Sequence, residues 1–323
     1  MRRFRSALLF GFCAASLVLG RAVHAEDKVV IAINPVSSAL PYYVAEQRGF
    51  FKDVGITTEA KQIIVPSLVI GGLIQDQIDV VGSMLAIDAA NGNIKKPGTI
   101  NYIALNAQSA TYKMEQFAVR TGYPAKSLAD LKGARIVSAP GLGNVTLAKG
   151  ALAAAGLKDG DYTLDQLDMA QHINVLKSGQ YDVAYTLEPG ATVMRQAGVA
   201  TTLQAGIIAQ LVLGDANANA YVGGAGFSGD FIAKRPDVAR RFAAAWSKAL
   251  DFINNDPQAA RPYLLKNTVT PESVVDIVPL LLFTMVDKLT PQDKVNFQKY
   301  VDFAVNMGAV SDKVDAVSYL KSY

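Results

Sequence analysis

Four short segments combine hydroxyl, amide and apolar side chains without a charged residue. They are NPVSSALPYY (34–43), IVPSL (64–68), GSML (82–85) and PGLGNVT (140–146). Serine, threonine and asparagine are common helix N-caps, so any one of these segments could be an ordinary cap. Together, ahead of expected helices, they could place backbone N–H groups and hydroxyls around one small solute. We therefore expect a pocket that offers neutral hydrogen-bond donors.

Two adjacent tyrosines follow Pro41 in the first of these segments. Pro41 suits the first turn of a helix, and Gly49 suits the position just past its end. Neighbouring residues in a helix point about 100° apart, so at most one of Tyr42 and Tyr43 can face a ligand. We expect Phe50 and Phe51 to belong to the core.

Glu188 follows the expected strand YDVAY and precedes Pro189. At the carboxyl end of a strand, its carboxylate could accept a hydrogen bond from an amine or a ring N–H of a ligand. An acidic residue in a first helical turn can equally satisfy the helix dipole. Both interpretations stay open at this point.

Other patterns give little support for catalysis, a nucleotide or a metal. Asp168 precedes His172 by four residues, but no G-x-S-x-G serine elbow occurs. PGLGNVT lacks both the third glycine of a dinucleotide fingerprint and the lysine of a P-loop. DANAN (215–219) is followed by Ala220 where a calcium loop needs glycine, so we expect a surface turn. We expect no enzyme activity, no cofactor and no metal.

The first 25 residues have the pattern of a secretory signal peptide. Three arginines precede an apolar stretch too short to span a bilayer, and Val23-His24-Ala25 resembles a cleavage site. Removing the four arginines of this segment from 31 basic residues leaves 27 against 28 acidic ones, a net charge of −1. The only cysteine, Cys13, would also leave. The mature chain would then have no disulfide and no polybasic surface for nucleic acid.

Strands that alternate with helices predict mostly parallel α/β architecture. Expected helices cover 66–75, 85–90 and 146–155, besides the one that begins at Pro41. The expected strands are 29–34, 56–60, 78–82, 100–106, 135–139, 162–167 and 181–185.

The last part of the chain, 236–323, has a mainly helical pattern. Apolar residues recur at three- and four-residue steps from Val238 to Ile253, and prolines interrupt the later segment. We expect two α/β lobes with this helical tail packed on one of them. The chain would cross between lobes near 116–123 and again in the glycine-rich segment 221–229.

The order and spacing of several segments resemble one known family. They include PYYVAEQRGFFKDVGI, IQDQIDVVGSMLAIDAA, SLADLKGARIVSAPG, SGQYDVAYTLEP and FQKYVDFAVNMGAVSDKVDAVSYL. The chain resembles periplasmic solute-binding proteins of ABC importers, in the group that includes sulfonate, taurine, nitrate and thiamine-precursor receptors. The resemblance implies a two-lobed type II periplasmic binding protein fold. It implies lobe I at 26–118 and 226–323, and lobe II at 119–225.

The resemblance also implies where a ligand would bind. Glycine-rich forms of the second loop are common in the family, and IVPSL departs from them. Carried over residue by residue, the family's ligand positions fall on Ser38, Pro41, Tyr42, Pro66, Ser67, Ser83, Met84, Gly141, Gly143, Asn144, Thr146 and Glu188.

The function that follows is that of a monomeric periplasmic receptor for a small organic solute, serving an ABC permease of the inner membrane. A periplasmic sensor and an exported enzyme using Glu188 and His172 are the alternatives. An organic acid is the first expectation for the ligand, ahead of a taurine-like zwitterion or a pyrimidine. Arg120 and Lys113 could reach an anionic ligand from the first crossing.

Overall fold

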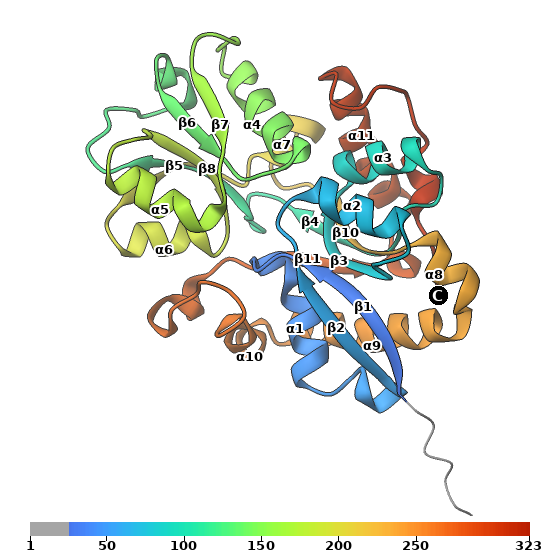
Figure 1. Ribbon diagram of the computed structural model, residues 1–323. Helices are drawn as coiled ribbons and strands as arrows, with labels where there is room; N and C mark the ends of the chain where they lie inside the picture. Colours follow the sequence, from blue (N-terminus) through green and yellow to red (C-terminus); the bar gives the residue numbers. More distant parts are fainter. Residues whose placement is uncertain (1–25) are drawn as a thin grey trace, which may run out of the picture.

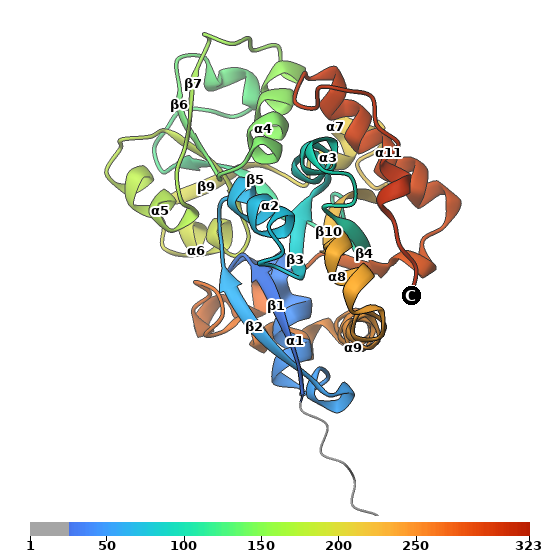
Figure 2. The same cartoon turned by 45° about the vertical axis from the view of Figure 1, so that its right-hand side comes forward.

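The computed structural model describes residues 26–323, and the expected signal peptide lies outside the described residues. The chain forms two α/β lobes, each built around its own sheet, as the ribbon shows from two directions (Figures 1 and 2). The part that the structure describes contains no helix long and apolar enough to cross a membrane.

The sheet of the first lobe has six strands in the order β11-β4-β10-β3-β1-β2. β1 pairs in parallel with β2 and β3, whereas β10 runs antiparallel to β3 and β4. Alternate apolar residues Val29, Ile31 and Ile33 of β1 are buried. The strands are β1 (Asp27–Ile33), β2 (Ile56–Gln62), β3 (Val80–Leu85), β4 (Asn101–Gln108), β10 (Ala220–Phe227) and β11 (Leu282–Met285).

The sheet of the second lobe has five strands in the order β7-β6-β8-β5-β9. β6 pairs in parallel with β7 and β8, and β5 lies antiparallel between β8 and β9. The strands are β5 (Glu115–Arg120), β6 (Arg135–Ser138), β7 (Thr163–Gln166), β8 (Val183–Leu187) and β9 (Ala200–Ala205).

Helices surround both sheets (Figure 1). The longer helices between the strands are α1 (Leu40–Gln47), α2 (Pro66–Ile74), α3 (Ala86–Lys95), α4 (Leu142–Ala154), α5 (Met169–Lys177), α6 (Gly190–Gln196) and α7 (Ile208–Leu213). Those of the C-terminal part are α8 (Gly229–Lys234), α9 (Pro236–Asn255), α10 (Pro257–Ala260) and α11 (Pro291–Asn306).

The C-terminal part confirms the predicted apolar stripe and adds a strand that was not predicted. Val238, Phe242, Trp246 and Ile253 of α9 are all buried. The four residues of β11 pair with β4, although this proline-interrupted region was expected to be mainly helical. A strand this short has too little sequence pattern to be separated from a loop.

The two crossings between sheets lie elsewhere than predicted. Residues 116–120 belong to β5, and 221–227 to β10, so the connections are 109–114 and 214–219. They lie side by side, since the Ala110 N–H donates to the Ala216 carbonyl oxygen at 2.7 Å. The glycines of β10 allow close strand approach: a Cβ on Gly223 would lie 2.0 Å from the Met84 carbonyl oxygen. The lobe boundaries remain a prediction. The hydrogen bond between Ala110 and Ala216 supports placing one boundary in 109–114 and the other in 214–219.

Two differences in element ends matter for the site. α4 begins at Leu142, four residues before the expected start, so Gly143 and Asn144 belong to its first turn. β3 runs on to Leu85, so Ser83 and Met84 are strand residues instead of loop residues. The left-handed backbone of Gly49 (φ 74°) after α1 is as predicted.

Candidate ligand-binding site

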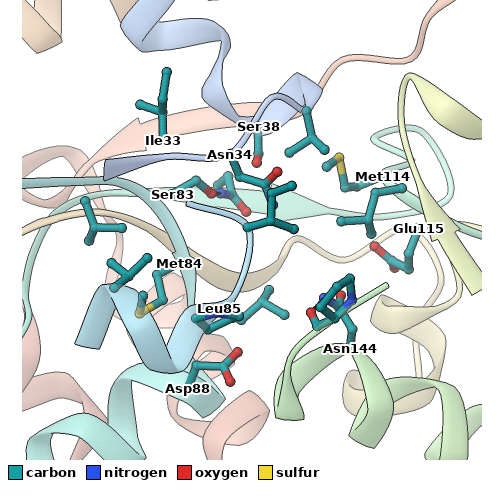
Figure 3. Close-up of a pocket in the computed structure, with 18 of the residues that line it drawn as sticks. Ile33, Asn34, Ser38, Ser83, Met84, Leu85, Asp88, Met114, Glu115 and Asn144 are labelled. Atoms are coloured by element: carbon teal, nitrogen blue, oxygen red, sulfur yellow. Dashed lines mark hydrogen bonds between the residues drawn. The ribbon is translucent and has the colours of Figure 1, made fainter. Parts of the chain in front are cut away.

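A cavity of about 790 Å³, counting the space continuous with solvent at its mouth, lies between the two lobes. The first lobe contributes residues of β1, β3 and β4 and the start of α2, and the second lobe contributes Pro140 and residues of α4 and β5. Figure 3 shows Asn34, Ser38 and Ser83 on one side of this space and Glu115 and Asn144 on the other. A small solute between them would touch both lobes.

Five of the residues predicted to bind a ligand line this cavity. They come from the three uncharged segments of the first lobe and from the one in the second lobe, where α4 begins, and they are Ser38, Pro66, Ser83, Met84 and Asn144. The structure thus brings together residues more than 100 positions apart in the sequence. The carboxyl ends of β1 and β3 and the start of α4 converge as expected for an α/β ligand site.

Neither tyrosine of α1 lines the cavity. Tyr42 packs on Phe51, with ring centroids 6.2 Å apart, and its hydroxyl lies 3.1 Å from the Thr58 hydroxyl. The Tyr43 hydroxyl donates to the Asn267 carbonyl oxygen at 3.1 Å. Both rings are buried in the core of the first lobe, because the neighbouring helix α9 covers this face of α1.

Four more predicted residues lie around the cavity without lining it. Pro41 borders a separate small hollow, and the side chain of Ser67 is exposed to solvent. Gly141 caps α4 and meets the opposite lobe, since a Cβ on it would lie 2.9 Å from Pro66 Cγ. The Thr146 hydroxyl donates to the Leu142 carbonyl oxygen within α4 at 2.7 Å.

Glu188 is fully buried beside the cavity, and its carboxylate has protein partners. The backbone N–H of Thr192 donates to it at 3.1 Å, Gln116 donates to its other oxygen, and Arg195 lies 3.8 Å away. These contacts match the second interpretation, an acidic residue at the start of α6. The backbone carbonyl of Glu188 accepts from the Ser37 N–H at 3.0 Å, which joins the two lobes.

Several polar residues that sequence reasoning missed line the cavity. Asn106 and Gln108 stand two apart on β4, and Glu115 begins β5. Asn34 stands at the end of β1, and Asp88 stands in the first turn of α3. The signal was present: polar residues spaced two apart in the otherwise apolar run IALNAQ face the same side of a strand.

Glu115 is the most unusual of these residues. Its side chain is fully buried, and burial raises the pKa of its carboxyl to about 8. A hydrogen bond from Gln108 opposes that shift. Oxygen Oε1 of Glu115, Oε1 of Gln108 and Oδ1 of Asn34 are buried without a partner among the described residues. Unpaired buried oxygens are uncommon in folded proteins and point to a missing donor.

Asp88 meets the N-terminus of α4 from the opposite lobe. The backbone N–H groups of Leu142 and Gly143 donate to its carboxylate, while burial raises its pKa to about 6. A Cβ on Gly143 would lie 2.8 Å from Asp88 Oδ2, so a glycine is needed at this close approach. The N–H groups that were expected to hold an anionic ligand are therefore occupied by a carboxylate of the protein itself.

No positive side chain of residues 26–323 lines the cavity. Of the described residues that line it, none is a lysine, arginine, histidine or aromatic residue. Arg120 forms an ion pair with Asp182 at 3.1 Å, and neither it nor Lys113 is a lining residue. The expectation that either could reach an anionic ligand is wrong for this structure.

His172 is buried within the second lobe, away from the cavity. Its Nδ1 lies 3.0 Å from the Thr186 hydroxyl, and its Nε2 lies 3.1 Å from the Leu167 carbonyl oxygen. Burial lowers the pKa of the imidazole, so the neutral form is favoured at neutral pH. Within residues 26–323, no three histidine, cysteine, aspartate or glutamate side chains are grouped so that they could hold a metal ion.

Comparisons with known proteins agree with this arrangement. The family model described as NMT1/THI5-like matches residues 37–260. No curated protein sequence matches the chain.

Solved structures share the fold at low sequence identity. The alkanesulfonate-binding protein SsuA from Xanthomonas axonopodis pv. citri, bound to MOPS, is 17% identical with a TM-score of 0.73, covering 93% of this chain and 100% of that one. The periplasmic nitrate-binding protein NrtA from Synechocystis PCC 6803 is 15% identical with a TM-score of 0.72, covering 91% and 84%. The desulfurization enzyme DszB is 16% identical with a TM-score of 0.67, covering 92% and 97%.

The family match spans more than half of the sequence, and the structural likeness extends over both lobes. The chain therefore belongs to the NMT1/THI5-like family and has the two-lobed type II periplasmic binding protein fold.

Proposed function

We propose that this protein is a receptor that binds one small organic solute in the cavity between its lobes. The observation that carries the proposal is the cavity itself, which is lined from both lobes by a mainly apolar surface with a few convergent polar groups. Such a composition is typical of small-molecule sites. Lobes that contact the same solute would close on it by a hinge motion at the two connections.

The receptor would act in the periplasm and deliver its solute to an ABC permease in the inner membrane. This part of the proposal is supported by the family and by the fold shared with the sulfonate- and nitrate-binding proteins. The signal-peptide pattern of the first 25 residues agrees with export.

A catalytic role has weaker support. DszB shows that the fold also accommodates an enzyme. In this chain, however, His172 and Glu188 bind other protein groups outside the cavity, and residues 26–323 contain no cysteine. The cavity offers carboxyl and amide groups with a mainly apolar wall, a set that favours binding over nucleophilic chemistry.

The test combines identification of the solute with blockage of the cavity. Native mass spectrometry of protein that was purified without denaturation should show a co-purified small molecule. Once this molecule has been removed, calorimetry should show that it binds again. Asn144→Trp would place an indole in the cavity, whereas Leu142→Trp, two residues away, replaces a half-exposed side chain outside the lining.

We expect Asn144→Trp to lower affinity by about 100-fold or more and Leu142→Trp to leave it within about threefold. A bound solute that both variants retain with unchanged affinity would place the binding site elsewhere. Turnover of the solute by the unmodified protein would replace the receptor role with catalysis.

A further inference from the structure

Among the described residues that line the cavity, the buried side-chain atoms without a hydrogen-bond partner are all oxygens. The amide of Asn144 already donates to the Pro140 carbonyl oxygen at 2.7 Å, and that of Asn106 donates to the Ser83 hydroxyl at 3.4 Å. Buried oxygens of Glu115, Gln108 and Asn34 have no partner in the described part of the chain. These three buried oxygens can accept, and a ligand that supplies N–H or O–H donors would satisfy them.

The charges of the cavity point the same way. Its ionisable groups among the described residues are the carboxyls of Asp88 and Glu115, with no cationic side chain in the lining. Asp88 is engaged by two N–H groups of α4, which leaves Glu115 as the free carboxyl. A ligand that presents a carboxylate or a sulfonate here would find no basic partner among the described lining residues, and Glu115 would repel it once ionised.

The apolar side chains of the cavity further restrict the class of ligand that we expect. Met84, Met114 and Leu147 line the cavity together with other aliphatic side chains, and no aromatic ring is among the described lining residues. Quaternary ammonium compounds carry no N–H and are usually bound by cages of aromatic faces. A protonated primary or secondary amine can instead donate directly to a carboxylate, which makes a strong, charge-assisted hydrogen bond.

Resting on the receptor function proposed above, we propose that the cavity selects a small aliphatic ammonium compound whose N–H groups donate to Glu115, with the Gln108 and Asn34 oxygens as further acceptors. This differs from the organic acid that the uncharged loops suggested. Figure 3 shows the Glu115 carboxyl at the edge of the cavity, on the side opposite Asn34 and Ser83.

Binding such a cation should release a proton near neutral pH. The empty site favours a protonated Glu115 because burial raises its pKa to about 8. Tyr185 of β8 and Tyr300 of α11 lie close enough for the charge of Glu115 to act on them, and burial raises their pKa values well above the usual range. Asp88, the other carboxyl of the cavity, has a pKa of about 6. Both tyrosines stay neutral and Asp88 is mostly ionised at pH 7, so Glu115 supplies the proton that is released when the ammonium group arrives.

The experiment is calorimetric titration with a matched panel: hexylammonium, tetramethylammonium, hexanesulfonate and hexanoate. We expect hexylammonium to bind and the two anions not to bind. Its affinity should rise by about 50-fold from pH 6 to pH 8, because Glu115 ionises over this range while the amine stays protonated below about pH 10. Buffers of different ionisation enthalpy should report release of about one proton per ligand at pH 6.5.

Glu115→Gln removes the charge while keeping the size of the side chain. We expect it to weaken hexylammonium binding by about 100-fold or more and to abolish the proton release. Asp182→Asn is the matched control, since this carboxylate lies in the same lobe and pairs with Arg120 and Arg135 outside the cavity. It should leave the affinity within about threefold.

The outcomes separate the ligand class from the receptor function. Tighter binding of either anion than of hexylammonium would overturn the ammonium assignment and leave the receptor function intact. The assignment would also fall if no amine bound up to about 10 mM, or if Glu115→Gln retained full affinity. The receptor function itself would be contradicted only by the mass spectrometry and the cavity-blocking variants described above.

Discussion

Asp88 and Glu115 enter the same cavity from opposite lobes, and their surroundings differ. Asp88 of α3 receives two backbone N–H groups from the start of α4, which ties the first lobe to the second. Glu115 of β5 receives Gln108 and keeps one oxygen without a protein partner in the described residues. We infer from this difference that Asp88 stabilises the contact between the lobes, and we assign the unpaired oxygen of Glu115 to a ligand, as proposed above.

The largest expected effect is on stability at high pH, where an ionised Glu115 should lower the free energy of unfolding. Its folded pKa of about 8 lies above the value of 4.5 expected in the unfolded chain. As pH rises from 4.5 to 8, the unfolded chain gives up its proton first, so stability falls over this window. At pH 9, Glu115→Gln should therefore be more stable than the unmodified protein, by up to about 4 kcal/mol.

Urea unfolding of both proteins at pH 4.5 and pH 9 measures this effect, with the window set by the pKa of Glu115. Near pH 4.5, where the native carboxyl is neutral like an amide, the two stabilities should nearly coincide. A stability difference that stays the same at both pH values would mean that Glu115 is not a buried, unpaired carboxyl.

Glu188 is also a buried carboxyl, but unlike Glu115 it has hydrogen-bond partners within the protein. Replacing it by leucine would leave the Thr192 N–H and the Gln116 amide without their acceptor and would remove the carboxylate that lies 3.8 Å from Arg195. We expect Glu188→Leu to lower the free energy of unfolding by about 3 kcal/mol at pH 7. In urea unfolding it should lose stability where Glu115→Gln gains it. If both variants changed the free energy of unfolding in the same direction, the distinction between paired and unpaired carboxyls would fail.

Asp88→Asn should have an intermediate effect, and the same effect for every ligand. The amide keeps an acceptor for α4 but loses the charge that complements the helix N-terminus, a change of about 1 kcal/mol. The closed arrangement should become less populated, so the radius of gyration of the unliganded protein should increase in X-ray scattering. The affinity for hexylammonium should fall by about fivefold, and that for any other amine that binds should fall by the same factor. A loss of about 100-fold, as expected for Glu115→Gln, would make Asp88, too, a ligand group.

The smallest effect is expected at Tyr42. Tyr42→Phe removes the hydroxyl that lies 3.1 Å from Thr58 and keeps the ring in the core. Stability should fall by about 1 kcal/mol or less, and ligand affinity should not change in calorimetry. A clear loss of affinity would show that α1 takes part in binding, and the contrast between Asp88 and Glu115 would no longer describe the whole site.

The fold was largely predictable because its signals are local. Short β-branched runs, Pro41 and Pro66 at helix starts, and Gly49 after α1 each reflect the backbone conformation at one position. The crossings were misplaced because glycines in β10 resemble a flexible linker in the sequence. Their actual role is to admit the neighbouring strand backbones, a requirement that becomes visible only once the sheet is assembled.

The residues of the candidate site that lie in loops before helices were predicted from the sequence. Those on β4 and β5, the strands on either side of the connection 109–114, were missed. Ser38, Ser83 and Asn144 stand beside expected helix starts, where ligand sites are usually sought. Gln108 and Glu115 stand at the facing ends of β4 and β5, and nothing in their local sequence says that both will turn toward one cavity. The capping of α4 by Asp88 depends on contact between lobes, which no sequence pattern expresses.

A crystal structure of the protein with its co-purified solute tests the central claim most directly. The claim predicts density between the two lobes, with a nitrogen of the solute within hydrogen-bond distance of the Glu115 carboxyl. A solute whose carboxylate or sulfonate occupies that position, or one bound outside the cavity, would contradict it.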